Sequence, residues 1–300
     1  MTIDEFRNEI RQVLESQKIT TADTRQFFAH YTKSDVPRLL LKEENNNVMR
    51  QYDGDYMNDP EEGRYFIDLI IRATEKSTHE CKHLFLDKLS ELRDVKLLYP
   101  AYSKCTFLSC WTTSTIKPGD ENKSDSLSHW RFYGDDGNGA CIISPATSII
   151  SVFNDLYNVT YGINSKGGGR GAATRPVKKL EKAITGRMNS FRRTAANAIE
   201  DLNELIHEIH PLLFLFKSSG YQDEQEVRSV VHKNSYGDHV EFDERTPSKA
   251  YCKSNEGLIC NGSIIIYGPK ADSALAIELM GLLAQRNIAA KVFMSQHQYR

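Results

Sequence analysis

Residues 125–143 read DSLSHWRFYGDDGNGACII, and few windows of this length hold so many side chains that do more than fill a core. The glycine, aspartate and asparagine cluster at 134–139 precedes a short apolar run, which predicts a tight turn leading into a buried strand. Glycines there allow close approach of a ligand or of another backbone segment. The rings of Trp130 and Tyr133, with the guanidinium of Arg131, suit a flat, anionic ligand such as a nucleotide. The alternative is a surface hairpin with one anchoring tryptophan.

Outward from this stretch, the chain has the composition of a globular protein. Its 300 residues are 40% apolar and 26% charged, enough to bury a substantial core. Helical periodicities are interspersed among short strand-like runs rather than alternating with them regularly, which favours an α+β fold over a doubly wound sheet. The chain ends in a strand–turn–helix–strand unit that begins with SIIIYG at 263–268. We therefore expect residues 1–300 to form a single domain with a βαβ-like unit at its C-terminal end.

The net charge of −2 is ordinary, but its distribution is uneven. Residues 165–193 contain nine bases and one acid, a net +8, so the rest of the chain sums to −10. This segment lies in a basic, mostly helical insertion expected at about 164–211. Such asymmetry favours a polyanion, RNA or DNA, or an acidic partner. A solvated helix face with a loop is the alternative to a nucleic-acid groove.

Other site classes receive little support from the sequence. The six cysteines show no CxxC pair and no Cys/His spacing suited to zinc. The acids of NDPEE at 58–62 could bind a metal, but the composition of their stretch favours a loop, so no metal site is predicted. Beyond Asp53, Asp55 and Asp59, no cluster of metal ligands stands out. No GxSxG, Walker A or GxGxxG pattern is present. Without a signal segment or a long apolar run, the expected location is the cytoplasm, with no membrane contact.

Two further places could carry chemistry. His30 ends the strand-like run FFAHYT, where a histidine can bind a ligand or simply be a satisfied structural residue. In DEQEVR, Glu226 and Arg228 would share one strand face, and Glu224 would continue that face by alternation. Mutual repulsion and partial burial would then raise the pKa of a carboxyl. A solvated strand edge with gatekeeping charges is the alternative.

Together, these pieces resemble a large bacterial family that is described only as a domain of unknown function. The resemblance spans nearly the whole chain, and its most specific parts are the WRxYG box and the C-terminus. The matching segments, in chain order, are HYT at 30–32, NDPEE at 58–62, LSHWRFYGDDGNGACI at 127–142, DEQEVR at 223–228, IIIYGPKA at 264–271 and SQHQYR at 295–300.

The order of these motifs is, more distantly, similar to that of ADP-ribosyltransferases. The resemblance implies a split, mixed or antiparallel sheet with flanking helices, and NAD as substrate. His30 would hold the ribose and amide side of NAD, Tyr133 would pack on nicotinamide beside the glycine turn, and Glu226 would be the late catalytic glutamate. In full, the implied catalytic residues are Glu226 and Glu224, and the implied NAD-binding residues are His30, Tyr31, Thr32, Trp130, Arg131, Tyr133, Gly139 and Arg228.

The implied chemistry is physically coherent. Cleavage of the nicotinamide–ribose bond develops an oxocarbenium ion, which a carboxylate bound to the ribose 2′-hydroxyl stabilises. The second carboxylate can orient or deprotonate the acceptor. We therefore expect a cytoplasmic ADP-ribosyltransferase, a toxin or anti-phage effector, whose acceptor is nucleic acid or, as the second choice, protein. Only the toxin interpretation implies a neutralising partner, an antitoxin or a chaperone protein. We expect Glu226→Gln to abolish transfer without disturbing the fold.

Two rival functions remain open on the sequence. An NAD glycohydrolase needs the same bond cleavage with water as acceptor. A non-catalytic nucleotide- or nucleic-acid-binding sensor of a defence system would need the binding residues alone. The leading hypothesis predicts that His30, Tyr133 and Glu226 line a single cleft.

Overall fold

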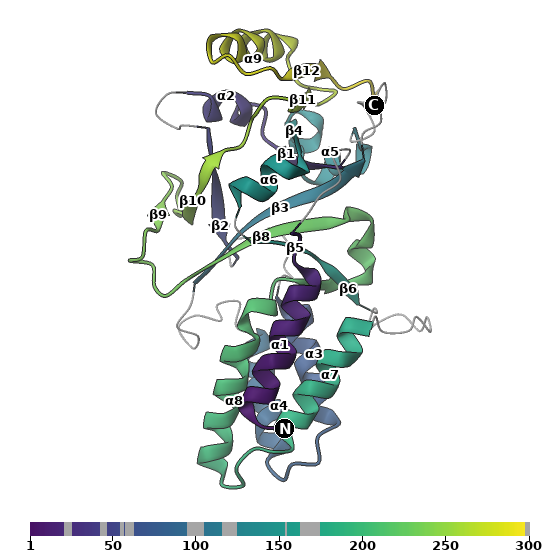
Figure 1. The fold of residues 1–300 in the computed structure, drawn as a ribbon, viewed down its shortest axis with the longest axis vertical. Coiled ribbons are helices and arrows are strands. Elements are labelled where there is room, and N and C mark those ends of the chain that lie inside the picture. The colour runs from purple at the N-terminus through teal and green to yellow at the C-terminus, as the bar shows by residue number, and fades with distance from the viewer. Residues whose placement is uncertain are drawn as a thin grey trace.

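The computed structural model describes residues 1–20, 26–42, 47–54, 57, 63–94, 105–115, 125–153, 155–162 and 175–297. The predicted motif NDPEE, the acids Asp55 and Asp59, the first part of the basic segment up to residue 174 and the last three residues lie outside these ranges. The described chain is an α+β structure in which a bundle of helices forms one end of an elongated molecule and a mixed sheet forms the other (Figure 1).

The main sheet contains ten strands, mostly antiparallel. They run in the order β12-β11-β4-β1-β3-β2-β10-β9, and β8 pairs with both β3 and β5. Their bounds are β1 (Gln26–Thr32), β2 (Val48–Asp53), β3 (Cys105–Thr115), β4 (Ala140–Pro145), β5 (Leu156–Asn158), β8 (Glu226–Lys233), β9 (Glu241–Phe242), β10 (Ala250–Gly257), β11 (Ile264–Tyr267) and β12 (Lys291–Met294). A separate two-stranded sheet pairs β6 (Thr160–Gly162) in parallel with β7 (Phe216–Ser218).

The main sheet divides along β3. Strand β8 lies along one edge of β3 from Cys105 to Thr112. Because that edge is taken, β2, which pairs at Phe107–Leu108, and β1, which pairs from Thr112 to Thr115, both lie along the other edge. One branch continues from β1 to β4 and β11, the other from β2 to β10. The prediction of an α+β fold with a mixed, mostly antiparallel sheet and flanking helices is confirmed.

The helices fall into two groups. Five of them form the bundle: α1 (Ile3–Gln17), α3 (Arg64–Glu75), α4 (Lys82–Asp94), α7 (Arg175–Met188) and α8 (Ala195–Ile209). The others lie on or beside the sheet: α2 (Val36–Leu40), α5 (Leu127–Phe132), α6 (Ala146–Val152), α9 (Ser273–Gln285) and the short 3-10 helices η4 (Asp135–Gly137) and η6 (Ser219–Glu224). The 3-10 helix η5 (His210–Leu212) directly follows α8, and its Leu212 lies in the core of the bundle. None of the described helices is both long and apolar enough to cross a membrane.

Helix α1 shows why the bundle forms. Thr2 and Glu5 make a reciprocal capping box that satisfies free amides at the helix start. Phe6, Ile10 and Val13 then recur at helical spacing and are buried. They share one apolar core with side chains of α3, α4, α7 and α8. The described part of the expected basic insertion therefore packs into the same core as the N-terminal helix.

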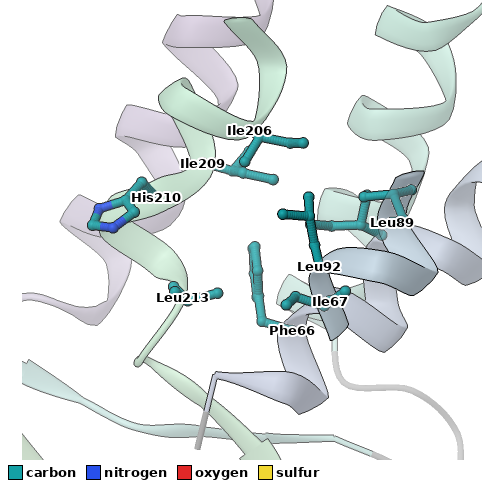
Figure 2. A pocket seen from close by; sticks show the side chains of 9 residues that line it. Phe66, Ile67, Leu89, Leu92, Ile206, Ile209, His210 and Leu213 are labelled. Atoms are coloured by element: carbon teal, nitrogen blue, oxygen red, sulfur yellow. The ribbon is translucent and has the colours of Figure 1, made fainter. Parts of the chain in front are cut away.

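A small cavity lies inside this bundle (Figure 2). Its volume is about 20 Å³, room for a water-sized molecule and far too little for a nucleotide. The lining is apolar apart from His210 and comes from Phe66, Ile67, Ile70, Leu89, Leu92, Ile206, Ile209 and Leu213. This cavity is a packing imperfection and offers little with which to orient a ligand.

Two features that the sequence predicts are present, one in the middle of the chain and one at its C-terminal end. The glycine-rich turn after α5 leads into β4, which is buried over most of its length. At the C-terminal end, β11 and β12 pair in parallel and α9 connects them, so the βαβ-like unit is present. Asp272 caps α9 by accepting a hydrogen bond from the amide of Ala274.

Candidate functional site

The start of β8 contains a buried ion pair. Glu226 pairs with Thr112 and Arg228 with Cys110 in the β3–β8 register, so both side chains lie on one face, as alternation predicts. Arg228 is fully buried and donates from Nε to Glu226 Oε1 at 2.8 Å and from Nη2 to Oε2 at 3.1 Å. It also donates to the carbonyl of Phe214. This bidentate geometry holds the carboxylate of Glu226 in one orientation.

Glu224 reaches this pair by a different route from the one expected. It is not in the strand: it ends η6, and β8 begins two residues later. Between them, Gln225 adopts a left-handed conformation with φ of 44°, which is uncommon for a residue other than glycine. The expectation that Glu224 continues the strand face by alternation is therefore wrong, because the chain turns at Gln225.

Lys217 joins the two carboxylates. Its Nζ atom lies 3.0 Å from Glu224 Oε2 and 2.8 Å from Glu226 Oε2. The side chain is 8% exposed, and its ammonium lies 5.2 Å from the centroid of the Tyr221 ring. The sequence interpretation missed this residue. The sequence feature that could have pointed to Lys217 is its position as a single cation directly after the apolar run at 212–216.

The ionisation of Glu226 is opposite to the expectation. Burial by itself would raise the pKa of this carboxyl, but the positive charges of Arg228 and Lys217 outweigh that effect and lower it to about 2. The prediction of a raised pKa through carboxylate repulsion is therefore wrong for Glu226. The side chain is a permanent anion near neutral pH rather than a proton-transferring base.

Tyr133 brings the glycine-rich stretch to the same place. It caps the C-terminus of α5, and its hydroxyl donates a hydrogen bond to Glu224 Oε1. Burial and this bond raise the pKa of Tyr133, so the phenol stays protonated. A second phenol, Tyr161 on β6, accepts a hydrogen bond from the amide of Glu226 at 2.8 Å. Tyr133 is 42% exposed and gives the cluster a side that faces solvent.

Tyr31 and Thr32 support this arrangement from β1. The Tyr31 ring stacks on His129 at a centroid distance of 5.2 Å, and His129 lies 6.0 Å from Tyr133. The Tyr31 hydroxyl accepts a hydrogen bond from the amide of Ser126. Thr32 ends β1 opposite Ala140. Tyr31 is itself buried, so its role here is to position the ring of His129, which lies next to Tyr133.

Trp130 and Gly139 are packing residues in this structure. Trp130 is fully buried, packs edge-on against Tyr31, and donates from its indole nitrogen to Asp125. It therefore presents no ring face to a ligand. A side chain at Gly139 would collide with the carbonyl of Thr32, so the close approach that glycine permits there is to another backbone segment. Arg131, next to them on α5, is exposed.

The C-terminal motif is attached to the same stretch. Ser295 Oγ donates to both carboxylate oxygens of Asp125 at 2.9 Å, and the amide of Gln296 adds a third bond. Asp125 thus joins the C-terminal segment to the indole of Trp130. Two of the motifs noted in the sequence are held together by one buried acid.

His30 lies on the other face of the sheet. Its register partner on β4 is Ile142, and its ring lies 5.2 Å from Trp111, in the core on the side away from Glu226. His30 Nδ1 is 2.9 Å from the carbonyl oxygen of Cys110. Burial lowers the pKa of His30, so the ring is neutral near pH 7. Strand alternation therefore separates His30 from Tyr133 and Glu226. The expectation that the three residues line a single cleft is wrong, and His30 cannot hold the ribose of a ligand bound at Glu226.

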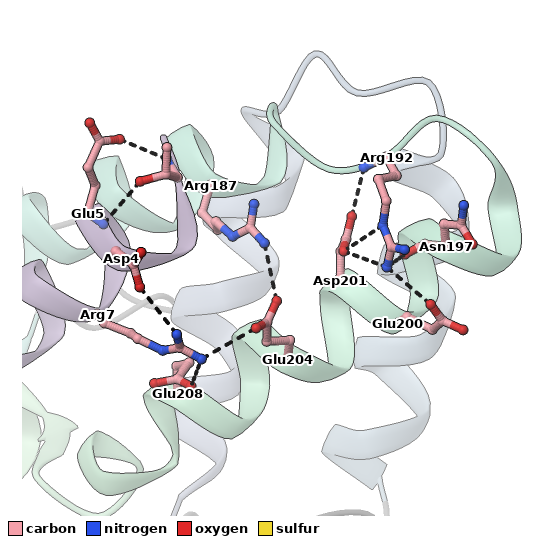
Figure 3. A network of polar contacts seen from close by, with 11 residues as sticks. Asp4, Glu5, Arg7, Arg187, Arg192, Asn197, Glu200, Asp201, Glu204 and Glu208 are labelled. Carbon is pink, nitrogen blue, oxygen red and sulfur yellow. Dashed lines mark hydrogen bonds and ion pairs between the residues drawn. The ribbon is translucent and has the colours of Figure 1, made fainter.

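Part of the described basic segment is paired within the bundle (Figure 3). Arg187 contacts Glu204 at 3.4 Å, and Arg192 contacts Asp201 at 2.9 Å. Lys179, also on α7, lies 3.0 Å from Glu9 on α1. The acids of α1 and α8 thus neutralise part of the positive charge that the sequence placed in one run. Arg175, Lys178 and Lys182 are exposed along α7.

Within the described ranges, no group of three or more His, Cys, Asp or Glu side chains is arranged to hold a metal ion. Asp53 instead accepts a hydrogen bond from the hydroxyl of Tyr236 at 2.5 Å. Asp55 and Asp59 lie outside the described residues.

No protein-family model, curated protein or solved structure matches this chain. Its function must be inferred from the cluster of Tyr133, Lys217, Glu224, Glu226 and Arg228, which we call the carboxylate site.

Proposed function

We propose that the protein cleaves NAD at the nicotinamide–ribose bond and transfers ADP-ribose to a macromolecule, using the carboxylate site without His30. The observation that carries the proposal is the pairing of a permanently ionised carboxylate, Glu226, with a second, more open one, Glu224, whose side chain is 18% exposed and bonded to Tyr133. A fixed negative charge of this kind stabilises a developing ribosyl cation, and it needs no reorganisation as the bond breaks.

Each residue then has a distinct role. The C–N bond to nicotinamide breaks and its electron pair leaves with nicotinamide, while C1′ of ribose becomes cationic. Glu226 supplies the fixed charge that stabilises that cation. Glu224, on the exposed side with Tyr133, orients the acceptor and takes its proton as the new bond to C1′ forms. Arg228 keeps Glu226 ionised and in place, as its two bonds to the carboxylate imply.

A nucleic acid is the acceptor that the charge distribution favours. Three bases, Arg175, Lys178 and Lys182, recur at helical spacing along α7 and are exposed. Such a row fits a phosphate backbone. The bases that pair with acids of the bundle, such as Arg187 and Arg192, serve the fold instead.

The test uses NAD labelled in its adenylate part, incubated with separate RNA, DNA and protein fractions. We expect label to enter nucleic acid with the wild-type chain, and Glu224→Gln to lower the rate by at least about 10²-fold. Glu200→Gln on α8 removes a carboxylate of the helical bundle, so it is the control for loss of one negative charge and should act like wild type. Glu224 is preferable to Glu226 here. The expectation from the sequence that Glu226→Gln leaves the fold intact is revised, because that change would leave the buried guanidinium of Arg228 without its counter-charge.

The outcomes separate the candidate activities. Free ADP-ribose without a labelled macromolecule would identify an NAD glycohydrolase. Label in the protein fraction alone would identify protein as the acceptor and leave the proposed chemistry unchanged. Unchanged NAD in the presence of every fraction would exclude both activities.

One observation favours a second function, a non-catalytic nucleotide-binding sensor. The carboxylate oxygens of Glu226 already accept from Arg228 and Lys217, and the side chain is only 7% exposed. A binding protein requires no access to that carboxylate. It predicts that NAD binding, measured by calorimetry, is weakened by Arg131→Ala, while NAD stays intact in wild-type and variant samples alike.

A further inference from the structure

Lys217 reaches the carboxylate site from a segment that neither carboxylate belongs to. It lies in β7, which pairs in parallel with β6 so that Lys217 stands next to Tyr161. The chain then passes through η6 and returns to Glu224 only seven residues later. The lysine and both acids are therefore set by separate local structures: β7 for Lys217, the end of η6 for Glu224 and β8 for Glu226.

The backbone around Glu224 is fixed independently of its side chain. Thr112 Oγ1 donates to the carbonyl of Glu224 at 2.6 Å, and the amide of Thr113 donates to the carbonyl of Gln225 at 3.1 Å. These bonds tie the turn to β3. The carboxylate of Glu224 is held by other groups, the hydroxyl of Tyr133 and the ammonium of Lys217.

We propose that Lys217 is a positioning residue, whose ammonium group holds Glu224 and Glu226 together as one ionised pair, and this inference rests on the proposed function of the site. Two carboxylates that share one cation at 3.0 and 2.8 Å avoid the repulsion that would separate them or protonate one of them. The guanidinium of Arg228 approaches Glu226 from its own strand. Lys217 is the cation that links this acid to Glu224.

The surroundings of Lys217 fit a fixed role. A buried ammonium is unfavourable unless it is paired, and this one has two carboxylates and the face of the Tyr221 ring around it. A lysine that served only solubility would extend into solvent. With the lysine in place, Glu226 is buried, whereas Glu224 is more exposed and lies beside Tyr133. The two acids therefore have the different exposures that their proposed roles require.

The test compares Lys217→Met, which keeps the length of the side chain and removes its charge, with Lys217→Arg, which keeps the charge. Lys76→Met is the matched control, because Lys76 pairs with Glu181 in the helical bundle. Glutamate side chains labelled with ¹³C report the titration of Glu224 and Glu226 directly by NMR. The second measurement is the pH profile of NAD consumption, with kcat and KM determined separately.

In Lys217→Met we expect the titration of Glu226, which Lys217 helps to keep ionised, to move up by about one to three pH units. The acid limb of kcat should move in the same direction, with kcat reduced more than KM is changed. Lys217→Arg should restore most of the wild-type titration and most of the wild-type pH profile of kcat. Lys76→Met should resemble wild type in both measurements. Unchanged titration in Lys217→Met, or failure of Lys217→Arg to restore it, would overturn the inference.

The two measurements also separate this inference from the proposed function. If wild-type protein consumes no NAD, the proposed function fails, while the NMR titration still reports whether Lys217 couples the two acids. If NAD is consumed but the titration is the same in wild type and Lys217→Met, the positioning role is wrong while the proposed function stands. Should Lys217→Met not fold, Lys217→Gln provides the same neutral comparison with a polar side chain.

Discussion

Two charged networks in this molecule differ in where their charges lie. In the bundle, Arg192 and Glu200 make an ion pair whose side chains are 52% and 68% exposed. In the carboxylate site, Arg228 and Glu226 are 0% and 7% exposed. The first pair is surrounded by water that screens it. The second has lost its hydration and is stabilised only by its partners.

This difference explains why the two networks carry different meanings. An exposed ion pair contributes little to stability and implies little about function. A buried pair is often no more stabilising than apolar side chains of the same size would be. Stability by itself therefore does not explain why such a pair is present. Placement of a carboxylate with fixed charge beside a more open one is such an explanation, and strongly perturbed ionisation of this kind is typical of functional sites.

The largest expected effect comes from breaking the buried pair. Arg228→Met leaves the Glu226 carboxylate buried with Lys217 as its counter-charge, and we expect the free energy of unfolding in urea to fall by roughly 3–5 kcal/mol. Adding Glu226→Leu should recover part of that loss, because the buried carboxylate that has lost one of its two counter-charges is then removed. If Arg228→Met unfolds at the same urea concentration as wild type, the pair is not buried in solution as it is here.

A second prediction concerns acid. The pKa of Glu226 in the folded protein is about 2, below its ordinary value of 4.5, so its contribution to stability is present above pH 4.5 and is lost as the pH falls from 4.5 to 2. The loss attributable to this group is about 3 kcal/mol. Unfolding free energies of wild type and Glu226→Gln, measured across this range, should converge as the pH falls. Parallel curves would contradict the depressed pKa.

The smallest effect is expected in the bundle. Glu200→Gln removes one exposed partner of Arg192, which keeps its contacts with Asp201. We expect no resolvable change in the midpoint of thermal unfolding at moderate salt. A drop comparable to that of Arg228→Met would mean that exposure does not distinguish the two networks.

Local patterns predicted several elements well. The glycine-rich turn into a buried strand, the C-terminal βαβ-like unit and the shared face of Glu226 and Arg228 all follow from short-range rules that a single segment satisfies by itself. The position of Glu224 does not follow from such rules, because the left-handed conformation of Gln225 interrupts the strand alternation. Nothing in the letters EQE marks that turn.

The roles of individual rings also depended on packing. Trp130 and Tyr133 are three residues apart in one stretch, yet one is fully buried and the other is 42% exposed. Their types permit either environment. Only the position of α5 against β1 and β4 decides which ring faces inward.

The sequence alone determined the α+β class, the buried strand after the glycine turn and the face on which Glu226 and Arg228 lie, because periodicity and turn chemistry are local properties. The tertiary structure decided which charges meet. Lys217 joins Glu224 and Glu226 only because β7, η6 and β8 converge, and His30 is separated from them because β1 directs it to the opposite face. Ionisation follows from those neighbours, so the low pKa of Glu226 is a property of the folded chain.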